Sequence, residues 1–352
     1  MGEKGTMSKA RMRVGVVGLG YWGPNLVRVL TERDDVELAW MCDLDEDKLS
    51  RLGRRHPATR TTTRAQDLFD DDELDALVIA TPVFSHYELA RASLQAGKHT
   101  FVEKPLAAST READELIHLA DEVGRRLMCG HTFLYSPPVR AVADMLREGA
   151  LGEIYFISSS RVNLGLHQRD VSVIWDLAPH DFSILLSWLG ELPCTVRASG
   201  RASIVPGIHD VAFVTLTFPS GVLVNVELSW LAPSKLRRTV VVGSERMVVY
   251  EDGAQEPIRV FDHGVVYEDP ETFGQYHLSY RTGDITSPKL STEEPLAAQI
   301  DAFVACCRDG SPSRVDIALA RDVVRLLDAA DRSLMQGGAE VAIGAEQLER
   351  AQ

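Results

Sequence analysis

The chain has 352 residues, of which 45% are hydrophobic and 25% are charged, and its formal net charge at neutral pH is -14. This length exceeds the size at which one hydrophobic core usually stops growing, so two domains are expected. The negative charge argues against nucleic acid or an anionic membrane as the main partner, because both need a positive surface. The five cysteines form no C-x-x-C pair, so neither a disulfide framework nor a metal site is expected. Without a signal-like start or a long apolar run, a cytoplasmic location is expected.

The first part of the chain alternates short β-rich runs with segments of helix length. Strands are predicted at 13–17, 36–42, 75–80, 99–102 and 127–130, and helices at 24–31, 46–55, 84–95 and 110–123. The predicted strands are apolar on both faces, as buried parallel strands must be. Residues 1–130 are therefore expected to form a doubly wound parallel sheet of the Rossmann type that binds NAD.

In the remainder of the chain the strands follow one another directly. Helices are predicted at 139–147, 179–189, 296–308 and 317–334, and strands at 154–160, 194–199, 211–218, 222–231, 239–242 and 247–250. Residues 131–352 are thus expected to form an α+β domain with a mixed or antiparallel open sheet that binds the substrate. Such a sheet suits a homodimer or homotetramer, because large open sheets rarely leave an apolar face in water.

A G-x-G-x-x-G motif lies between the first predicted strand and the first helix. Gly18 would permit the tight turn, Gly20 the close approach of a pyrophosphate, and Gly23 the packing of helix on strand. Asp43 follows the second strand, where a carboxylate accepts hydrogen bonds from the adenosine ribose and repels a 2'-phosphate. The motif therefore predicts NAD rather than NADP. The alternative is that Asp43 only caps the next helix, although Asp45 could serve the same cap.

Two further motifs follow at strand ends: Ala80-Thr81-Pro82, leading to His86, and Glu103-Lys104-Pro105. The carboxyl ends of parallel strands are where open α/β sheets bind ligands. Together with the glycine motif and Asp176-Leu177-Ala178-Pro179-His180, these motifs stand in the order typical of one family. Over nearly its whole length the chain resembles the glucose-fructose oxidoreductase and inositol dehydrogenase family, abbreviated Gfo/Idh/MocA.

The resemblance implies that Lys104 lies beside the nicotinamide and hydrogen-bonds the reacting hydroxyl, while Asp176 and His180 complete the catalytic group. Oxidation of a secondary alcohol needs a base for the hydroxyl proton, which suits His180, and a group that polarises the oxygen, which suits Lys104. Which of the two accepts the proton stays open. For His86, a cofactor contact and a structural role at the helix start are equally open. The residues expected to contact the cofactor are Gly18, Gly20, Tyr21, Trp22, Gly23, Asp43, Thr81, Pro82, His86 and Glu103.

Pro179 suits the first turn of a helix. If that turn is helical, Asp176 and His180 share a face, and the positive helix N-terminus favours a neutral His180, whereas Asp176 favours its charged form.

Polar and aromatic residues precede the catalytic segment, and Asn163, Arg169 and Trp175 are the candidates for holding a sugar. The guanidinium groups of Arg161 and Arg169 would also suit the phosphate oxygens of a diphosphate. The alternative is that both arginines pair with carboxylates such as Asp170.

The segment 171–175 replaces the glycine-rich stretch of many family members. The segment Leu-Ala-Pro-His-Asp is similar to the corresponding segment of members that act on the 3-hydroxyl of UDP-N-acetylglucosamine-type substrates. A sugar or nucleotide-sugar dehydrogenase is therefore predicted. The alternatives are an inositol or polyol dehydrogenase, an aldehyde or imine reductase, and a non-catalytic NAD-bound sensor.

Overall fold

The computed structural model describes residues 11–165, 167–168, 171–268, 277–311 and 317–344. The chain forms two compact units: Met1–Thr132 with Glu294–Val324, and Phe133–Glu293 with Arg325–Gln352. The first unit thus takes in a late segment of the chain, whereas the sequence pattern divides the chain once, after residue 130.

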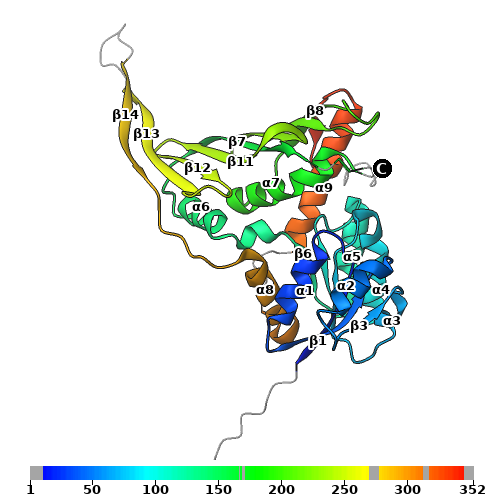
Figure 1. Ribbon diagram of the computed structural model, residues 1–352. Helices are drawn as coiled ribbons and strands as arrows, with labels where there is room; N and C mark the ends of the chain where they lie inside the picture. Colours follow the sequence, from blue (N-terminus) through cyan, green and yellow to red (C-terminus); the bar gives the residue numbers. More distant parts are fainter. Residues whose placement is uncertain (1–10, 166, 169–170, 269–276, 312–316, 345–352) are drawn as a thin grey trace, which may run out of the picture. The chain divides into compact units, whose positions relative to one another are not determined.

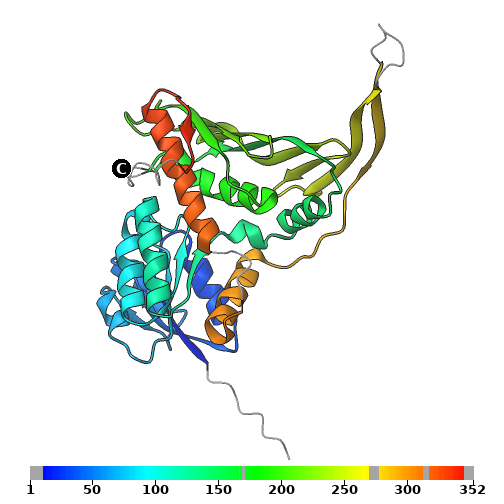
Figure 2. The ribbon, with the colours of Figure 1, turned by 180° about the vertical axis from the view of Figure 1, so that it is seen from behind.

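The first unit is built on a six-stranded parallel sheet in the order β3-β2-β1-β4-β5-β6. This is the strand order of the Rossmann fold, so the predicted fold class is confirmed. Figures 1 and 2 show helices on both faces of this sheet, with α4 and α5 on one side and α1 and α8 on the other. The strands are β1 (Met12–Val17), β2 (Val36–Cys42), β3 (Arg60–Thr62), β4 (Ala76–Ile79), β5 (His99–Glu103) and β6 (Leu127–Gly130). The helices are α1 (Gly23–Thr31), α2 (Glu46–Gly53), α3 (Gln66–Phe69), α4 (His86–Gln95), α5 (Thr110–Glu122) and α8 (Pro295–Asp309), and the 3-10 turn η1 is Val83–Ser85.

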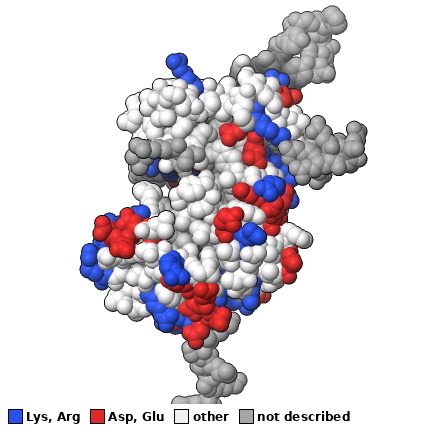
Figure 3. Space-filling model, turned by 90° about the vertical axis from the view of Figure 1, so that its right-hand side faces the viewer, with Lys and Arg blue, Asp and Glu red and all other residues white. Residues whose placement is uncertain are grey.

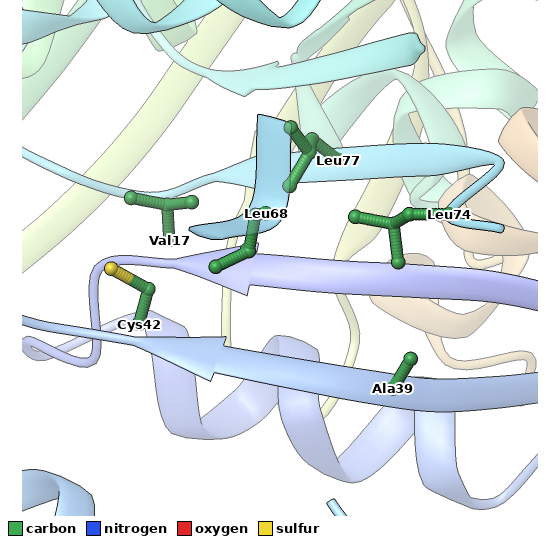
Figure 4. Close-up of a cluster of buried hydrophobic side chains, with 6 residues drawn as sticks. All are labelled: Val17, Ala39, Cys42, Leu68, Leu74 and Leu77. Atoms are coloured by element: carbon green, nitrogen blue, oxygen red, sulfur yellow. The ribbon is translucent and has the colours of Figure 1, made fainter. Parts of the chain in front are cut away.

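One face of this sheet carries a compact apolar cluster, drawn in Figure 4, of Val17, Ala39, Cys42, Leu68, Leu74 and Leu77. Gly15 of β1 makes room for it, because a Cβ at Gly15 would lie 2.8 Å from a methyl carbon of Leu68. The short elements β3 and α3, which the sequence pattern does not predict, complete this side of the sheet. The packing fixes β1 between β2 and β4, which is the point where the strand order reverses and where such sheets bind ligands.

The late segment joins the first unit through α8. Glu294, just before α8, pairs with Arg28 of α1, and Asp301 of α8 pairs with Arg33, just beyond α1. The ring of Phe303 packs edge-on against Phe101 of β5, with ring centroids 5.6 Å apart. The periodicity of a helix shows that it has an apolar face but not which sheet that face covers, so the sequence pattern could not reveal this return.

The second unit contains a nine-stranded sheet in the order β14-β13-β12-β11-β7-β10-β9-β8-β15. Strands β7 and β10 pair in parallel and the other neighbours are antiparallel, so the predicted mixed sheet is confirmed. Its strands are β7 (Ile154–Leu164), β8 (Thr195–Arg201), β9 (Val211–Thr217), β10 (Leu223–Ser229), β11 (Leu231–Gly243), β12 (Met247–Glu251), β13 (Ile258–Glu268), β14 (His277–Thr286) and β15 (Val341–Ala342). Helices α6 (Pro137–Arg147), α7 (Val173–Leu189) and α9 (Ile317–Met335) accompany it, α9 beginning in the first unit, and the 3-10 turn η2 is Thr132–Tyr135.

Helix α7 begins at Val173, six residues earlier than predicted, and Pro179 lies inside it. The prediction that Pro179 stands in the first turn is therefore wrong. The early start has a packing reason: Val173 and Ile174 are both fully buried, so extending the helix removes their side chains from water. Figures 1 and 2 also show β13 and β14 as a long hairpin that extends beyond the other strands of the sheet.

Candidate functional site

The glycine motif lies at the carboxyl end of β1. Gly18 has a φ of 95°, and a Cβ there would lie 2.5 Å from the carbonyl oxygen of Ala80. A Cβ at Gly23 would lie 2.1 Å from the carbonyl oxygen of Gly18, so both positions require glycine. At Gly20 a Cβ would meet nothing within 4 Å, which leaves open space beside the first turn of α1. The loop therefore fits the pyrophosphate of a dinucleotide, which binds at such helix starts through backbone N–H groups.

Asp43, at the carboxyl end of β2, is joined to this loop. Its Oδ2 accepts a hydrogen bond of 2.6 Å from the Leu19 N–H, and its Oδ1 accepts one of 2.9 Å from the Asp45 N–H. The cap of α2 is Asp45, which accepts bonds from the backbone N–H groups of Asp47 and Lys48. Capping is thus not the role of Asp43. The Nζ atom of Lys48 lies 3.4 Å from Asp43 Oδ1, so a cation stands beside the proposed ribose position.

Glu103, at the end of β5, is a buried carboxyl group. Burial raises its pKa to about 7, against the opposing effect of the Lys104 ammonium, the Lys104 backbone N–H and the nearby Trp22 indole. The Trp22 N–H makes no hydrogen bond of normal geometry within the described residues. Gly130 of β6 packs against the carboxyl, since a Cβ there would lie 2.8 Å from Glu103 Oε2. Lys104 is half-buried at the same edge of the sheet.

His131 follows β6 at this edge and is fully buried. Neither of its ring nitrogens has a hydrogen-bond partner within the described residues. Burial lowers its pKa to about 3, and the positive charge of Lys104 acts in the same direction. His131 is therefore a neutral imidazole, and the sequence pattern gave no signal for it.

His86, the first residue of α4, is held by two backbone carbonyls. Its Nδ1 lies 2.8 Å from the Pro105 oxygen and its Nε2 lies 2.8 Å from the Thr81 oxygen. Burial lowers its pKa. A neutral imidazole donates to only one of these two carbonyls. Because both ring nitrogens face the backbone, the contacts favour the structural role: His86 lies between the loop after β4 and the loop after β5.

The other expected cofactor residues lie at the same edge. Tyr21 is 91% exposed, Pro82 is exposed before η1, and the Thr81 hydroxyl accepts a bond of 2.8 Å from Ser85. The carboxyl ends of β1, β2, β4 and β5 thus bring together all of the expected cofactor residues, every one of which belongs to the first unit.

Asp176 and His180 both lie on α7 in the second unit, one helical turn apart, and so share a face as expected. Asp176 is in the first turn, whereas His180 is the eighth residue of the helix. The expected effect of the helix N-terminus on His180 is therefore wrong, because that effect falls off within one turn. The Oδ2 atom of Asp176 accepts a hydrogen bond of 3.0 Å from the indole of Trp230, and the His180 ring meets Phe133 edge-on at 5.0 Å between centroids.

Arg161 of β7 forms a buried ion pair with Asp181 of α7, and Ser159 donates a further bond of 2.8 Å to that carboxylate. The guanidinium also stands over the Phe133 ring, 4.8 Å from its centroid. Of the two alternatives for Arg161, the ion pair favours pairing with a carboxylate over binding of a diphosphate, since the guanidinium charge is already neutralised inside the unit. The carboxylate partner is thus Asp181, the last residue of the Leu-Ala-Pro-His-Asp segment.

The three residues expected to hold the sugar have different surroundings. Asn163 lies on β7, and its Oδ1 is buried without a hydrogen-bond partner among the described residues. The indole N–H of Trp175 donates to Asp331 of α9, so this N–H group is already hydrogen-bonded within the second unit. Arg169, together with Asp170, lies outside the described residues.

Charges of both signs are intermixed on the face seen in Figure 3, without a broad basic area among the described residues there. In the part of the chain that the structure describes, no helix is both long and apolar enough to cross a membrane. The same residues contain no group of three or more His, Cys, Asp or Glu side chains placed to hold a metal ion.

Comparison with known proteins gives two matches to family models. The model of the GFO/IDH/MocA oxidoreductase family, NAD-binding Rossmann fold, matches residues 12–131, and the GFO/IDH/MocA C-terminal domain matches residues 139–249.

Among similar proteins, D-apiose dehydrogenase of Paraburkholderia graminis is 27% identical over 300 residues, which cover 83% of this chain and 76% of the relative. UDP-N-acetylglucosamine 3-dehydrogenase of Acidithiobacillus ferrooxidans is 29% identical over 238 residues, which cover 67% of this chain and 72% of the relative. Among solved structures, GenD2 from gentamicin A biosynthesis, in complex with NAD, has a TM-score of 0.81 at 25% identity, covering 98% of this chain and 100% of GenD2.

Proposed function

The chain belongs to the GFO/IDH/MocA family of oxidoreductases with an NAD-binding Rossmann domain, and from this premise we propose that it oxidises or reduces a ring position of a sugar or nucleotide sugar. The observation that carries the proposal is the presence, in one chain, of a glycine loop open at Gly20 and of Asp176 and His180 on one helical face. The first supplies a place for the cofactor, and the second supplies a base with a carboxylate beside it.

The proposed reaction moves two electrons and two hydrogen nuclei. The glycine loop and Asp43 would hold NAD, and the chemistry that NAD would supply is uptake of the hydride that leaves the carbinol carbon of the substrate. His180 takes the hydroxyl proton on a ring nitrogen, so that the C–O bond becomes a carbonyl. Lys104 donates a hydrogen bond to the same oxygen and stabilises the negative charge that develops on it. Asp176 orients the imidazole and stabilises its protonated form. In the reverse direction, His180 returns the proton.

We propose that NAD(H) binds more tightly than NADP(H), and the Asp43→Ser variant tests this. The variant would lose the repulsion of a 2'-phosphate by Asp43. Lys48 Nζ, now 3.4 Å from Asp43 Oδ1 and 3.7 Å from Asp45 Oδ2, would keep one carboxylate neighbour in place of two and would attract the phosphate more strongly. The expected result is that the preference for NAD narrows by about tenfold or more, the scale of one charged hydrogen bond. Titration of the protein with NADH and NADPH, followed by nicotinamide fluorescence, measures the two affinities.

The matched control is Asp45→Ser, which replaces the cap of α2 by another good capping residue. It should leave NAD preferred over NADP, because Asp43 keeps its carboxylate, 3.4 Å from Lys48 Nζ. Equal affinities for NADH and NADPH in the unmodified protein would show that the assignment to Asp43 is wrong.

For the substrate we propose a nucleotide sugar, acted on at a ring hydroxyl for which the 3-position is the candidate. Two observations support this. Residues 171–175 replace the glycine-rich stretch expected before the catalytic aspartate and form the start of α7, with Ser172 as its N-cap residue. A relative named UDP-N-acetylglucosamine 3-dehydrogenase matches two thirds of the chain.

A substrate panel tests the proposal: UDP-N-acetylglucosamine, UDP-glucose, TDP-glucose, D-apiose, D-glucose and myo-inositol, each with NAD and read by absorbance of the reduced nicotinamide. We expect kcat/KM for one nucleotide sugar to exceed that of the free sugars at least about tenfold, the scale of one additional hydrogen-bonded group. Saturation by myo-inositol or a free aldose at micromolar levels, with the nucleotide sugars inert, would instead establish a polyol or free-sugar dehydrogenase.

We also propose that copies of the chain associate through the open face of the nine-stranded sheet. The strand register puts Phe156, Phe213 and Leu223 on one face, where they are 44%, 45% and 50% exposed. Leu223 and Phe156 are direct cross-strand neighbours, whereas Phe213 lies opposite Glu227, and adjacent exposed apolar side chains on an open sheet face favour an interface. Light scattering is expected to give at least twice the chain mass of 38.8 kDa, and a particle of one chain mass would contradict the proposal.

A further inference from the structure

A buried tryptophan supports Asp176 from a strand end far along the chain. Trp230 lies between β10 and β11, is 1% exposed, and donates its indole N–H to Asp176 Oδ2 at 3.0 Å. Its backbone is held on both sides, because its N–H donates to the Asp210 carbonyl at 2.9 Å and its carbonyl accepts from the Gly165 N–H at 3.0 Å. A donor on so constrained a backbone holds the carboxylate in one orientation.

Gly165 and His167, which follow β7, lie against the same indole. The ring of His167 meets Trp230 with centroids 5.3 Å apart, and a Cβ at Gly165 would lie 2.9 Å from Trp230 Cδ1 and 3.0 Å from Asn163 Oδ1. Only a glycine permits this close approach of backbone to indole. Asn163, His167 and Trp230 therefore form one cluster that continues to Asp176.

Two polar atoms of this cluster are buried without a partner. Within the described residues, neither Asn163 Oδ1 nor His167 Nε2 has a hydrogen-bond partner. Burial of a polar group without a hydrogen bond is unfavourable, so two such groups in one cluster need an explanation. An amide oxygen accepts a bond from a hydroxyl, and an imidazole nitrogen can donate or accept one. Neighbouring hydroxyl groups on a carbohydrate ring offer both donors and acceptors.

We propose that Asn163 and His167 form a subsite for hydroxyl groups of the carbohydrate ring adjacent to the reacting carbon, and that Trp230 is a positioning residue for Asp176. The inference rests on the proposed sugar dehydrogenase function. It assigns ring recognition to Asn163 and His167 and orientation of the carboxylate to Trp230. The two roles separate in kinetics, because lost ground-state binding raises KM whereas lost orientation lowers kcat.

The His167→Phe variant keeps a ring against Trp230 but removes the nitrogen. With UDP-N-acetylglucosamine and myo-inositol as probes, calorimetric titration into NADH-loaded protein is expected to show affinity for the bound sugar falling about three- to tenfold, the scale of one hydrogen bond. His167→Gln, which restores a polar group, should recover part of the loss. An unchanged affinity in His167→Phe, or failure of the unmodified protein to bind either probe, would overturn the subsite.

The Trp230→Phe variant keeps the aromatic packing but removes the donor. Its kcat with the best sugar of the panel should fall about tenfold with little change in KM. The control is Trp188→Phe, which also removes a buried indole N–H, one that donates to the Val139 carbonyl at 3.0 Å. Equal loss of kcat in the two variants would overturn the positioning role. Absence of turnover with every sugar of the panel would instead count against the proposed function, whereas the titrations test the subsite by itself.

Discussion

Replacement of Lys104 by alanine is expected to lower kcat by about two to four orders of magnitude, because a group that stabilises a developing oxyanion acts mainly in the transition state. The affinity for NAD(H) should change little, since the proposed cofactor contacts come from the glycine loop and Asp43. Initial rates with the best sugar of the panel and fluorescence titration with NADH measure the two quantities. Loss of the ammonium also removes a charge that lowers the pKa of Glu103, so that pKa should rise further.

The control for this variant is Lys235→Ala, which removes an exposed lysine from β11 of the second unit. It should leave both kcat and cofactor affinity unchanged. A Lys104→Ala enzyme that retains nearly full turnover would show that the role assigned to the Glu-Lys-Pro segment is wrong.

The His180→Gln variant is expected to lower kcat by about two to four orders of magnitude, the usual contribution of a positioned general base. The residual rate should rise with pH, because hydroxide can then take the proton that the imidazole no longer accepts. His118→Gln, an exposed substitution on α5, is the matched control. If His180→Gln stays within about threefold of the unmodified rate, the proton acceptor is not His180, and Lys104 becomes the candidate.

The first unit was predictable because its signals are local. Strands buried on both faces, alternating helices and a glycine loop all lie within short stretches, and the observed β2 and β6 have the predicted bounds. The hairpin β13–β14 was not predicted, because exposed apolar residues such as Val265 and Tyr280 break the alternation that marks a half-buried strand.

The residues of the candidate site likewise differ in whether a local sequence pattern marks them. Motif residues such as Lys104, Asp176 and His180 could be named from the sequence, since each stands in a recognisable pattern. The residues that contact these motif residues in the folded chain could not be named in this way. Trp230 bonds to a residue 54 positions away, and Arg161 pairs with Asp181 across 20 positions, and neither contact leaves a local pattern. Arg161 is an example. Its guanidinium group suggested a phosphate ligand, whereas in the folded chain Asp181 neutralises its charge.

The return of residues 294–324 to the first unit has a consequence for synthesis on the ribosome. Strand β6 ends at Gly130, but α8, with Phe303 against Phe101, emerges only after strands β7 to β14 of the nine-stranded sheet have been made. At about 5–20 residues per second this delay is roughly ten to thirty seconds. During that interval the nascent Rossmann domain lacks a helix that covers it and leaves apolar surface open to chaperones. The dinucleotide domain, although first in the sequence, is thus completed late in translation.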